Sequence, residues 1–182
     1  MARLPYLDKS TVAAEHHDLL ARNITLYREL VHSPGALRAF QGLGQYIRFK
    51  SKVDPRLREL AILQVGYLAS AAYEWAHHIK IGYDFGVSDV DIAALIDDTE
   101  GRTCSLEPHA RCVLRAAREM TRAGKVSDAT FASLRTFLDE ERTVDLVMTI
   151  AFYNAVVRVL ASLEIDVEPE YMTYLEKYPL PK

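Results

Sequence analysis

Apolar residues recur at intervals of three and four along most of the chain, which is the spacing of helices that bury one face. Clear runs extend from Leu57 to Leu68 and from Leu146 to Leu160, and the alternation typical of strands is absent. The pattern therefore predicts an all-α protein of about eight helices. We expect them at residues 9–22, 34–49, 55–69, 72–85, 89–96, 107–123, 128–138 and 141–162.

Residues that begin and end helices stand between these segments. Asp54 is an N-cap residue followed by proline, and Ser88 opens a capping box with an acid three positions later. Gly86 and Gly124 are expected to close the helices before them. The length fits one domain, 1–182, with a core of about 34–165. Three prolines in residues 166–182 predict an extended C-terminal arm that lies on the subunit or on a neighbour.

Charge and composition narrow the classes of function. Lys and Arg number 22 against 25 Asp and Glu, without a basic stripe, so we expect no nucleic-acid partner. Gln64, Glu74 or Asn154 break the longest apolar runs before the ~18 residues that cross a membrane, and the N-terminus lacks an apolar signal core. We therefore expect a cytoplasmic protein without membrane contact. Cys104 and Cys112 form neither a disulfide framework nor a metal-binding spacing.

The candidate chemistry lies where the helices at 55–69 and 72–85 meet. Glu59 is on the first helix in apolar surroundings, and Glu74 and His78 share a face of the second at i and i+4. Carboxylates and an imidazole in an apolar space have perturbed pKa values, as general acid–base catalysis requires. The same i,i+4 pair is also common on helix surfaces, where it only stabilises the helix. Two ligands are too few for zinc, and we expect no metal.

Residues beside this pair are candidates for binding a substrate. His77 is ~100° around the helix from His78, so the two should not both face one small site. By spacing, His77 pairs with Tyr73 instead. We expect Tyr73 and Trp75 to shape the pocket wall, and His77 to reach the pocket or a subunit interface.

At these residues the chain resembles the carboxymuconolactone decarboxylase / alkylhydroperoxidase AhpD-like family. The resemblance covers roughly residues 34–165 and is strongest from Arg58 to Ser88, and the segment 152–154 is similar to the family's closing helix. It implies an AhpD-like helical subunit that assembles into a homo-oligomer, often a trimer or a hexamer.

The family holds at least two chemistries. Hydroperoxidase members resemble Glu-x11-Cys-x-x-Cys-x-x-x-His, in which Glu59 and His78 match but the cysteines fall on Ala71 and Glu74. Thiol peroxidase chemistry needs a nucleophilic sulfur and a resolving partner. Decarboxylase members carry a Glu-x-x-x-His pair and act without a cofactor on a lactone acid. The chain resembles a branch marked by Tyr-Glu-Trp-x-x-His that lacks the Cys-x-x-Cys motif.

The resemblance therefore implies a lyase that needs no cofactor and acts on a small organic acid, lactone or enolisable ring compound. In this prediction His78 is the general base or acid, Glu74 orients it or shares its proton, and Glu59 completes the relay. The alternatives are an alkylhydroperoxidase or peroxiredoxin-like antioxidant protein and a non-catalytic ligand-binding oligomer.

Four further residues complete the predicted site. Tyr153 and Asn154, on the helix at 141–162, are candidates for hydrogen bonds to the ligand. Decarboxylation needs a cation or hydrogen-bond donors for the developing enolate, and Arg56 or Arg58 is the candidate.

Overall fold

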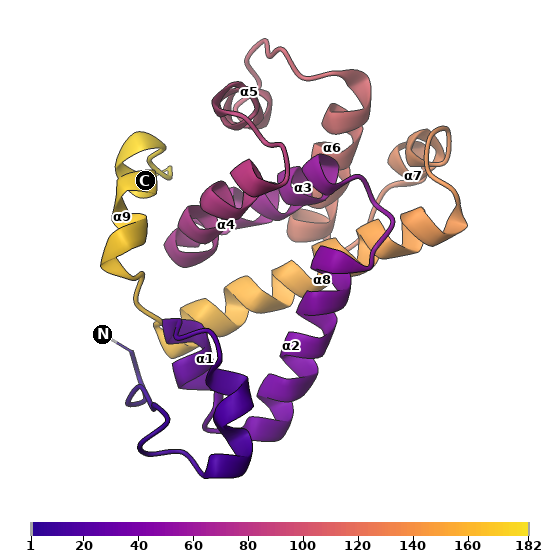
Figure 1. Cartoon of the computed structure of the whole chain (residues 1–182). Helices are drawn as coiled ribbons and strands as arrows, with labels where there is room; N and C mark the ends of the chain where they lie inside the picture. The colour runs from indigo at the N-terminus through magenta and orange to yellow at the C-terminus, as the bar shows by residue number, and fades with distance from the viewer. Residues whose placement is uncertain (1, 182) are drawn as a thin grey trace.

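The computed structural model describes residues 2–181 and, over that range, consists of helices and connecting segments without a strand (Figure 1). The predicted all-α class is confirmed. Residues 1 and 182 of the predicted domain lie outside the described range. In chain order the elements are η1 (Ala14–Leu20), α1 (Thr25–Leu30), α2 (Pro34–Phe49), α3 (Pro55–Leu68), α4 (Ala72–Asp84), α5 (Asp89–Thr99), α6 (Pro108–Ala123), α7 (Asp128–Leu134), α8 (Glu140–Leu163), η2 (Pro169–Tyr171) and α9 (Met172–Lys177), where η denotes a 3₁₀ helix.

Helix α3 is enclosed by other helices and contacts α4, α5, α6 and α8. It begins as predicted, because an Asp54 side-chain oxygen accepts the Leu57 amide at 3.0 Å and a proline takes the first helical position. Every residue from Leu57 to Tyr67 is buried. Arg58 and Glu59 are among them, and two buried charges inside an enclosed helix require partners.

A tight turn brings α4 back against α3. Gly66 permits the close approach, since a Cβ at its position would lie 3.4 Å from the amide nitrogen of Trp75. Ser70 turns the chain in the left-handed region, with φ +47°. The two helices therefore meet at the small residues 69–71. Their packing brings Glu59 of α3 within hydrogen-bond distance of His78 of α4.

Helix α8 crosses the molecule between the group formed by α3, α4 and α6 and the pair formed by α1 and α2 (Figure 1). Phe40 of α2 packs against Phe152 of α8, with ring centroids 4.9 Å apart. By length and composition alone, α8 could cross a membrane, with a mean hydropathy of 1.8 in its most apolar window. The expectation that Asn154 keeps this run below that length is therefore wrong. Helix α8 contacts α3 and α6, and 39% of that window is buried in the described structure.

Several predicted boundaries change at the ends of the chain. The helix expected at 9–22 is instead the short η1, followed by α1, which the sequence pattern did not predict. Residues 166–182 are not an extended arm, because η2 and α9 form there and α9 packs on α4. The predicted capping box of Ser88 and Asp91 is present, and Gly86 and Gly124 take positive φ values of +90° and +78°.

Candidate active site

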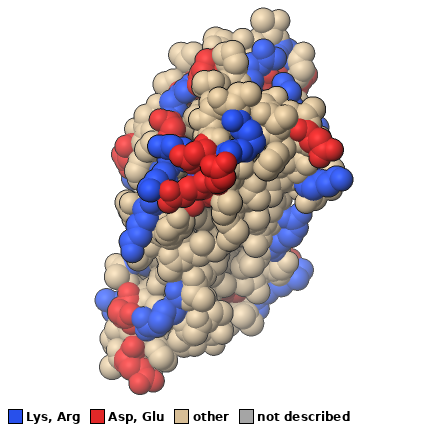
Figure 2. Space-filling model, turned by 90° about the vertical axis from the view of Figure 1, so that its right-hand side faces the viewer, with Lys and Arg blue, Asp and Glu red and all other residues tan. Residues whose placement is uncertain are grey.

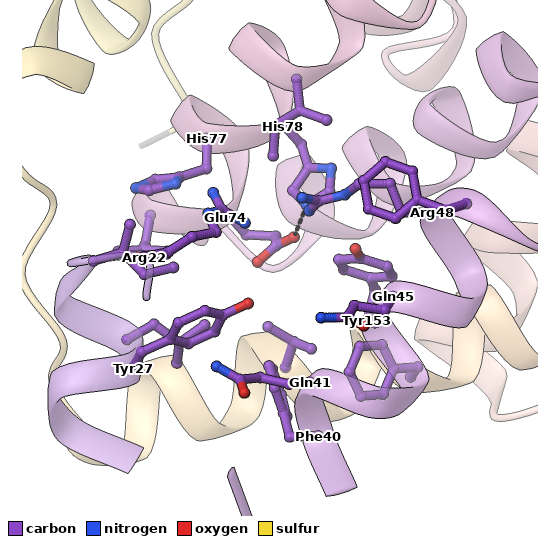
Figure 3. Close-up of a pocket in the computed structure, with 18 of the residues that line it drawn as sticks. Arg22, Tyr27, Phe40, Gln41, Gln45, Arg48, Glu74, His77, His78 and Tyr153 are labelled. Carbon is purple, nitrogen blue, oxygen red and sulfur yellow. Dashed lines mark ion pairs between the residues drawn. The ribbon is translucent and has the colours of Figure 1, made fainter. Parts of the chain in front are cut away.

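A cavity of about 430 Å³ lies between the segment before α1 and helices α1, α2, α4 and α8 (Figure 3). Its walls are largely aromatic and aliphatic, and most of its polar side chains come from α2 and α4. Small-molecule sites in proteins have roughly 300–1,000 Å³. The cavity is therefore large enough for a small organic molecule. Glu74, His77 and His78 of α4 form part of its wall.

His78 stands between two carboxylates at the inner wall of this cavity. Its Nδ1 lies 2.7 Å from Oε2 of Glu59 in a hydrogen bond, and its Nε2 lies 3.0 Å from Oε1 of Glu74. Behind Glu59, Arg58 donates from Nε and Nη2 to Oε1 at 3.0 and 2.9 Å. These four residues, which we call the relay, form a line of alternating charges from the core to the cavity.

The carboxylates of the relay determine the protonation of His78. Burial alone lowers the pKa of the imidazole, but the charges of Glu74 and Glu59 and the hydrogen bond with Glu59 raise that pKa to about 9. Burial also raises the pKa of the Glu59 carboxyl, yet His78 and Arg58 outweigh burial and bring it below its ordinary value. At neutral pH, His78 is therefore an imidazolium and Glu59 a carboxylate.

Glu74 is the member of the relay that faces the cavity. Its Oε1 is buried and forms the ion pair with Nε2 of His78 at 3.0 Å, without hydrogen-bond geometry. Figure 3 shows the Glu74 carboxylate between the His78 ring and the centre of the cavity. Tyr153 meets the His78 ring edge-on at 4.9 Å, and burial together with the charges of Glu74 and Glu59 raises the pKa of its phenol. Glu74 can therefore accept a proton, and the Tyr153 hydroxyl can donate a hydrogen bond.

His77 also lines the cavity, which is one of the two places that we expected it to reach. Its ring stacks between Tyr73 and Tyr171, with centroids 4.1 and 3.7 Å away, so the predicted pairing with Tyr73 is present. Its Nε2 lies 2.7 Å from Oε2 of Glu168. Oε1 of Glu168 accepts the Thr25 amide at 2.7 Å and the Tyr73 hydroxyl at 3.3 Å. This group of five residues, the clasp, fastens the C-terminal segment to α4 and to the start of α1.

Two of the predicted binding residues lie away from the cavity. Trp75 is fully buried and donates its indole N–H to the Tyr178 carbonyl at 2.8 Å, so it holds the C-terminal segment and does not shape the pocket wall. Asn154 donates to the Thr121 hydroxyl at 3.1 Å and to the Ile150 carbonyl at 3.0 Å. Neither residue lines the cavity, because both face a neighbouring helix or segment.

The arginines that line the cavity are not the ones that we expected to stabilise an enolate. Arg56 is engaged by two carboxylates outside the cavity, and Arg58 is buried behind Glu59. Arg48 and Arg22 line the cavity instead and lie on opposite sides of it in Figure 3. Neither arginine was predicted from the sequence.

Helix α2 carries the polar residues of the outer wall. Gln41, Gln45 and Arg48 stand at i, i+4 and i+7, so they share one face, and Figure 3 shows them reaching into the cavity. This spacing is legible in the sequence. A polar stripe on a helix usually indicates a solvated face, however, and the sequence does not show what packs above it.

Both cysteines lie away from the cavity, and the same geometry bears on metal binding. Neither cysteine lines the cavity: Cys104 lies 3.6 Å from an Asp98 carboxylate oxygen, and Cys112 is buried on α6, where burial raises the pKa of its thiol. No group of three or more His, Cys, Asp or Glu side chains within residues 2–181 is arranged to hold a metal ion.

Comparison with known proteins gives a family and a fold. Residues 34–123, from the start of α2 to the end of α6, match the carboxymuconolactone decarboxylase family. No curated protein shows significant sequence similarity to the chain. A debrominase, Bmp8, solved as a cysteine-to-alanine variant in complex with 2,3,4-tribromopyrrole, superposes with a TM-score of 0.80 at 17% identity and covers 97% of this chain and 99% of its own.

Two further solved structures are named after AhpD. An alkylhydroperoxidase AhpD core, an uncharacterized peroxidase-related protein from Ralstonia eutropha, has a TM-score of 0.78 at 17% identity, over 96% of this chain and 95% of that one. A protein of unknown function from Agrobacterium tumefaciens, a putative antioxidant defence protein AhpD, has a TM-score of 0.68 at 20% identity, over 77% and 95%. The family match over residues 34–123 confirms the predicted resemblance to the carboxymuconolactone decarboxylase family, and the solved structures show that the fold is AhpD-like.

Proposed function

We propose that the protein is a cofactor-independent enzyme that transfers protons on a small organic acid, lactone or enolisable ring compound, in the manner of a carboxymuconolactone decarboxylase. One observation carries the proposal: the buried relay of paired charges ends at the cavity wall in the carboxylate of Glu74. Holding charged groups in a buried site is costly, and sites with such perturbed groups are typical of catalysis.

In this proposal each member of the relay has a different role. Glu74 is the base, because its carboxylate lies between the imidazolium and the space in which a substrate carbon acid would lie. His78 is the acid and the electrostatic support, since its pKa of about 9 keeps it protonated at neutral pH. Glu59 and Arg58 are positioning residues that hold the imidazolium in place.

In a decarboxylation these roles act in order. The bond between carbon and the departing carboxylate breaks, its electron pair forms an enolate, and CO₂ leaves. The imidazolium of His78 stabilises the enolate charge and supplies the proton that completes the product carbon. The imidazole keeps its Nδ1 proton on Glu59, and a proton from solvent, taken up at the Nε2 that faces Glu74, restores the imidazolium.

Proton exchange at carbon is the direct test. Lactone acids and enolisable ring acids would be incubated with the protein in D₂O, while NMR follows C–H to C–D exchange and the release of CO₂. We expect exchange with wild type, and at least ~100-fold slower exchange with Glu74→Gln or His78→Gln. Glu119→Gln is the matched control, because Glu119 binds Ser127 and Thr130 away from the cavity. Equal rates in wild type and Glu74→Gln would refute the assigned base.

The similar solved structures support a small ring as ligand, and they also suggest thiol peroxidase chemistry as a second candidate function. The debrominase Bmp8 binds a substituted pyrrole on a similar fold, whereas two other neighbours are described in terms of peroxidase or antioxidant function. A thiol peroxidase would consume peroxide and lose that activity in a Cys104→Ser, Cys112→Ser double variant. The cavity geometry favours acid–base chemistry, because neither thiol reaches it. A non-catalytic binding protein would show no exchange, and its Glu74→Gln variant would behave as wild type.

A further inference from the structure

The cavity holds two arginines that no acidic side chain neutralises. Arg22 and Arg48 line it, and neither forms an ion pair with a carboxylate within residues 2–181. Asp18, at the rim, is taken by Arg38 at 2.7 Å, and Glu74 is already balanced by the imidazolium beside it. The empty cavity therefore carries an excess of positive charge, which an anionic ligand would neutralise.

Arg48 is the better placed of these two cations. Its Nε is buried and has no hydrogen-bond partner in the described chain. Its backbone carbonyl accepts a hydrogen bond from Nη1 of Arg58 at 3.1 Å, which ties the end of α2 to the relay. Figure 3 shows Arg48 on the same side of the cavity as His78 and Tyr153. A buried N–H without a partner is costly, and a guanidinium binds a carboxylate at two points, so a ligand carboxylate is the group that fits.

The walls beside Arg48 favour a flat ring. Tyr27, Phe40, Phe49, Phe152 and Tyr153 all line the cavity. The rings of Phe40 and Phe152 lie 4.9 Å apart, and those of Phe152 and Tyr153 lie 5.4 Å apart at 82°. Aromatic side chains pack best against the faces and edges of another ring, at centroid distances of about 4.5–7 Å.

We infer that this cavity binds a planar aromatic or conjugated monocarboxylate, with the carboxylate on Arg48 and the ring among the aromatic side chains. Arg48 is then the specificity residue of the site. The inference deepens the proposed function and rests on it only in placing the reacting end of the ligand near Glu74. Binding through Arg48 can be measured whether or not the bound acid reacts.

Isothermal titration calorimetry at neutral pH tests this anchor. The probes are three planar acids (benzoate, 4-hydroxybenzoate and 2-furoate), the neutral 4-hydroxybenzamide, and the non-planar cyclohexanecarboxylate. The proteins are wild type, Arg48→Met and the control Arg122→Met, which removes the same charge from an exposed residue of α6. Unliganded melting curves establish that each variant is folded.

We expect at least one planar acid to bind wild type and Arg122→Met equally, and Arg48→Met at least about tenfold more weakly. The amide and the non-planar acid should also bind wild type at least about tenfold more weakly than that planar acid. Equal affinity for wild type and Arg48→Met overturns the inference, as does equal affinity for the amide, or no binding of any planar acid.

The two proposals fail in different ways. If a planar acid binds through Arg48 but no compound undergoes proton exchange, the anchor stands and the proposed function fails. If exchange proceeds equally fast in wild type and Arg48→Met, the proposed function stands and the anchor fails.

Discussion

At the scale of single residues, the charge of His78 makes the stability of the protein depend on pH. The folded-state pKa of about 9 lies above the ~6.5 of an unfolded histidine, so protonation stabilises the folded state. This contribution is complete below about pH 6.5 and is lost as the pH rises through about 9. We therefore expect the difference in free energy of unfolding between wild type and His78→Gln to shrink as the pH rises through this window. Urea denaturation at several pH values measures it, and a difference that stays constant would contradict the assigned charge.

We expect Glu59 to help keep His78 protonated. Replacing it by glutamine removes one of the two carboxylates that raise the pKa of His78. We expect the pKa of His78 in Glu59→Gln to fall below about 9, as followed by an NMR titration of the imidazole ring. Glu119→Gln should leave the titration unchanged, and so would Glu59→Gln if Glu59 only filled space.

Three residues of the relay were predicted as one site, and Arg58 only as a candidate cation. The i,i+4 spacing of Glu74 and His78 was sufficient to place them on one face, and Glu59 stood out on the preceding helix in apolar surroundings. The charge of His78 was not predictable, because burial and the carboxylates shift its pKa in opposite directions. Trp75 was chosen for its size and position, but its indole N–H finds a partner in the C-terminal segment, which no local pattern shows.

At the scale of elements, the clasp joins three segments that are far apart in the sequence. Glu168 precedes η2, accepts the Thr25 amide at the start of α1, and meets His77 of α4. Burial raises the pKa of the Glu168 carboxyl, but the hydrogen bonds from His77 and Thr25 outweigh it and lower the pKa to about 2. Because this pKa is depressed, the contribution to stability is present above the unfolded value of ~4.3 and is lost as the pH falls toward about 2.

We expect Glu168→Ala to destabilise the fold by about 2 kcal/mol or more, because it leaves buried donors without an acceptor. Hydrogen exchange at the Thr25 amide should become faster, and that region borders the cavity through Ile24 and Leu26. The exposed Glu170, two residues on, is the matched control, and Glu170→Ala should change neither quantity. Unchanged exchange at Thr25 in Glu168→Ala would show that the clasp does not hold α1.

Element boundaries were predictable where local signals are strong, as in α3 and α5, whose capping residues are both present. They failed where tertiary contacts decide. The prolines of residues 166–182 indicated an extended arm, yet Tyr171 stacks on His77 and Lys177 pairs with Asp89, and these contacts accompany two helical turns. The polar stripe of α2 was not predicted to line a site, because the sequence does not show that it shares a cavity with the segment before α1.

At the scale of the whole molecule, one apolar face is exposed in the described residues 2–181. Val144, Met148, Ala151 and Ala155 of α8 are exposed at i, i+4, i+7 and i+11, on the helix of the described chain that is long and apolar enough to cross a membrane. Figure 2, which views the side of the molecule where α2 and the start of α8 lie, shows a broad area without charged residues below a group of acidic and basic ones. Such a contiguous surface usually marks an interface, and it agrees with the homo-oligomer that the family resemblance implies.

A second copy of the chain is the occupant that the charges favour. If two α8 helices pack antiparallel about Ala151, Arg158 of one lies within a turn of Glu141 of the other, which in its own subunit pairs with Lys52 at 2.9 Å. Within residues 2–181, Arg158 donates hydrogen bonds to the carbonyl and amide oxygens of Asn154 and forms no ion pair. The small Ala151 and Ala155 permit the two helices to approach closely, and opposite charges at the ends fix their direction.

We expect wild type to be at least a dimer by size-exclusion chromatography with light scattering, and Ala151→Glu to be monomeric, because a buried unpaired carboxylate opposes association. Phe131→Glu is the control, since Phe131 is an exposed apolar residue of α7 outside this face, and it should leave the mass unchanged. Monomeric wild type, or an oligomer that survives Ala151→Glu, would exclude this face as the interface. Co-sedimentation of wild type with lipid vesicles, abolished by the same substitution, would show instead that a bilayer covers α8.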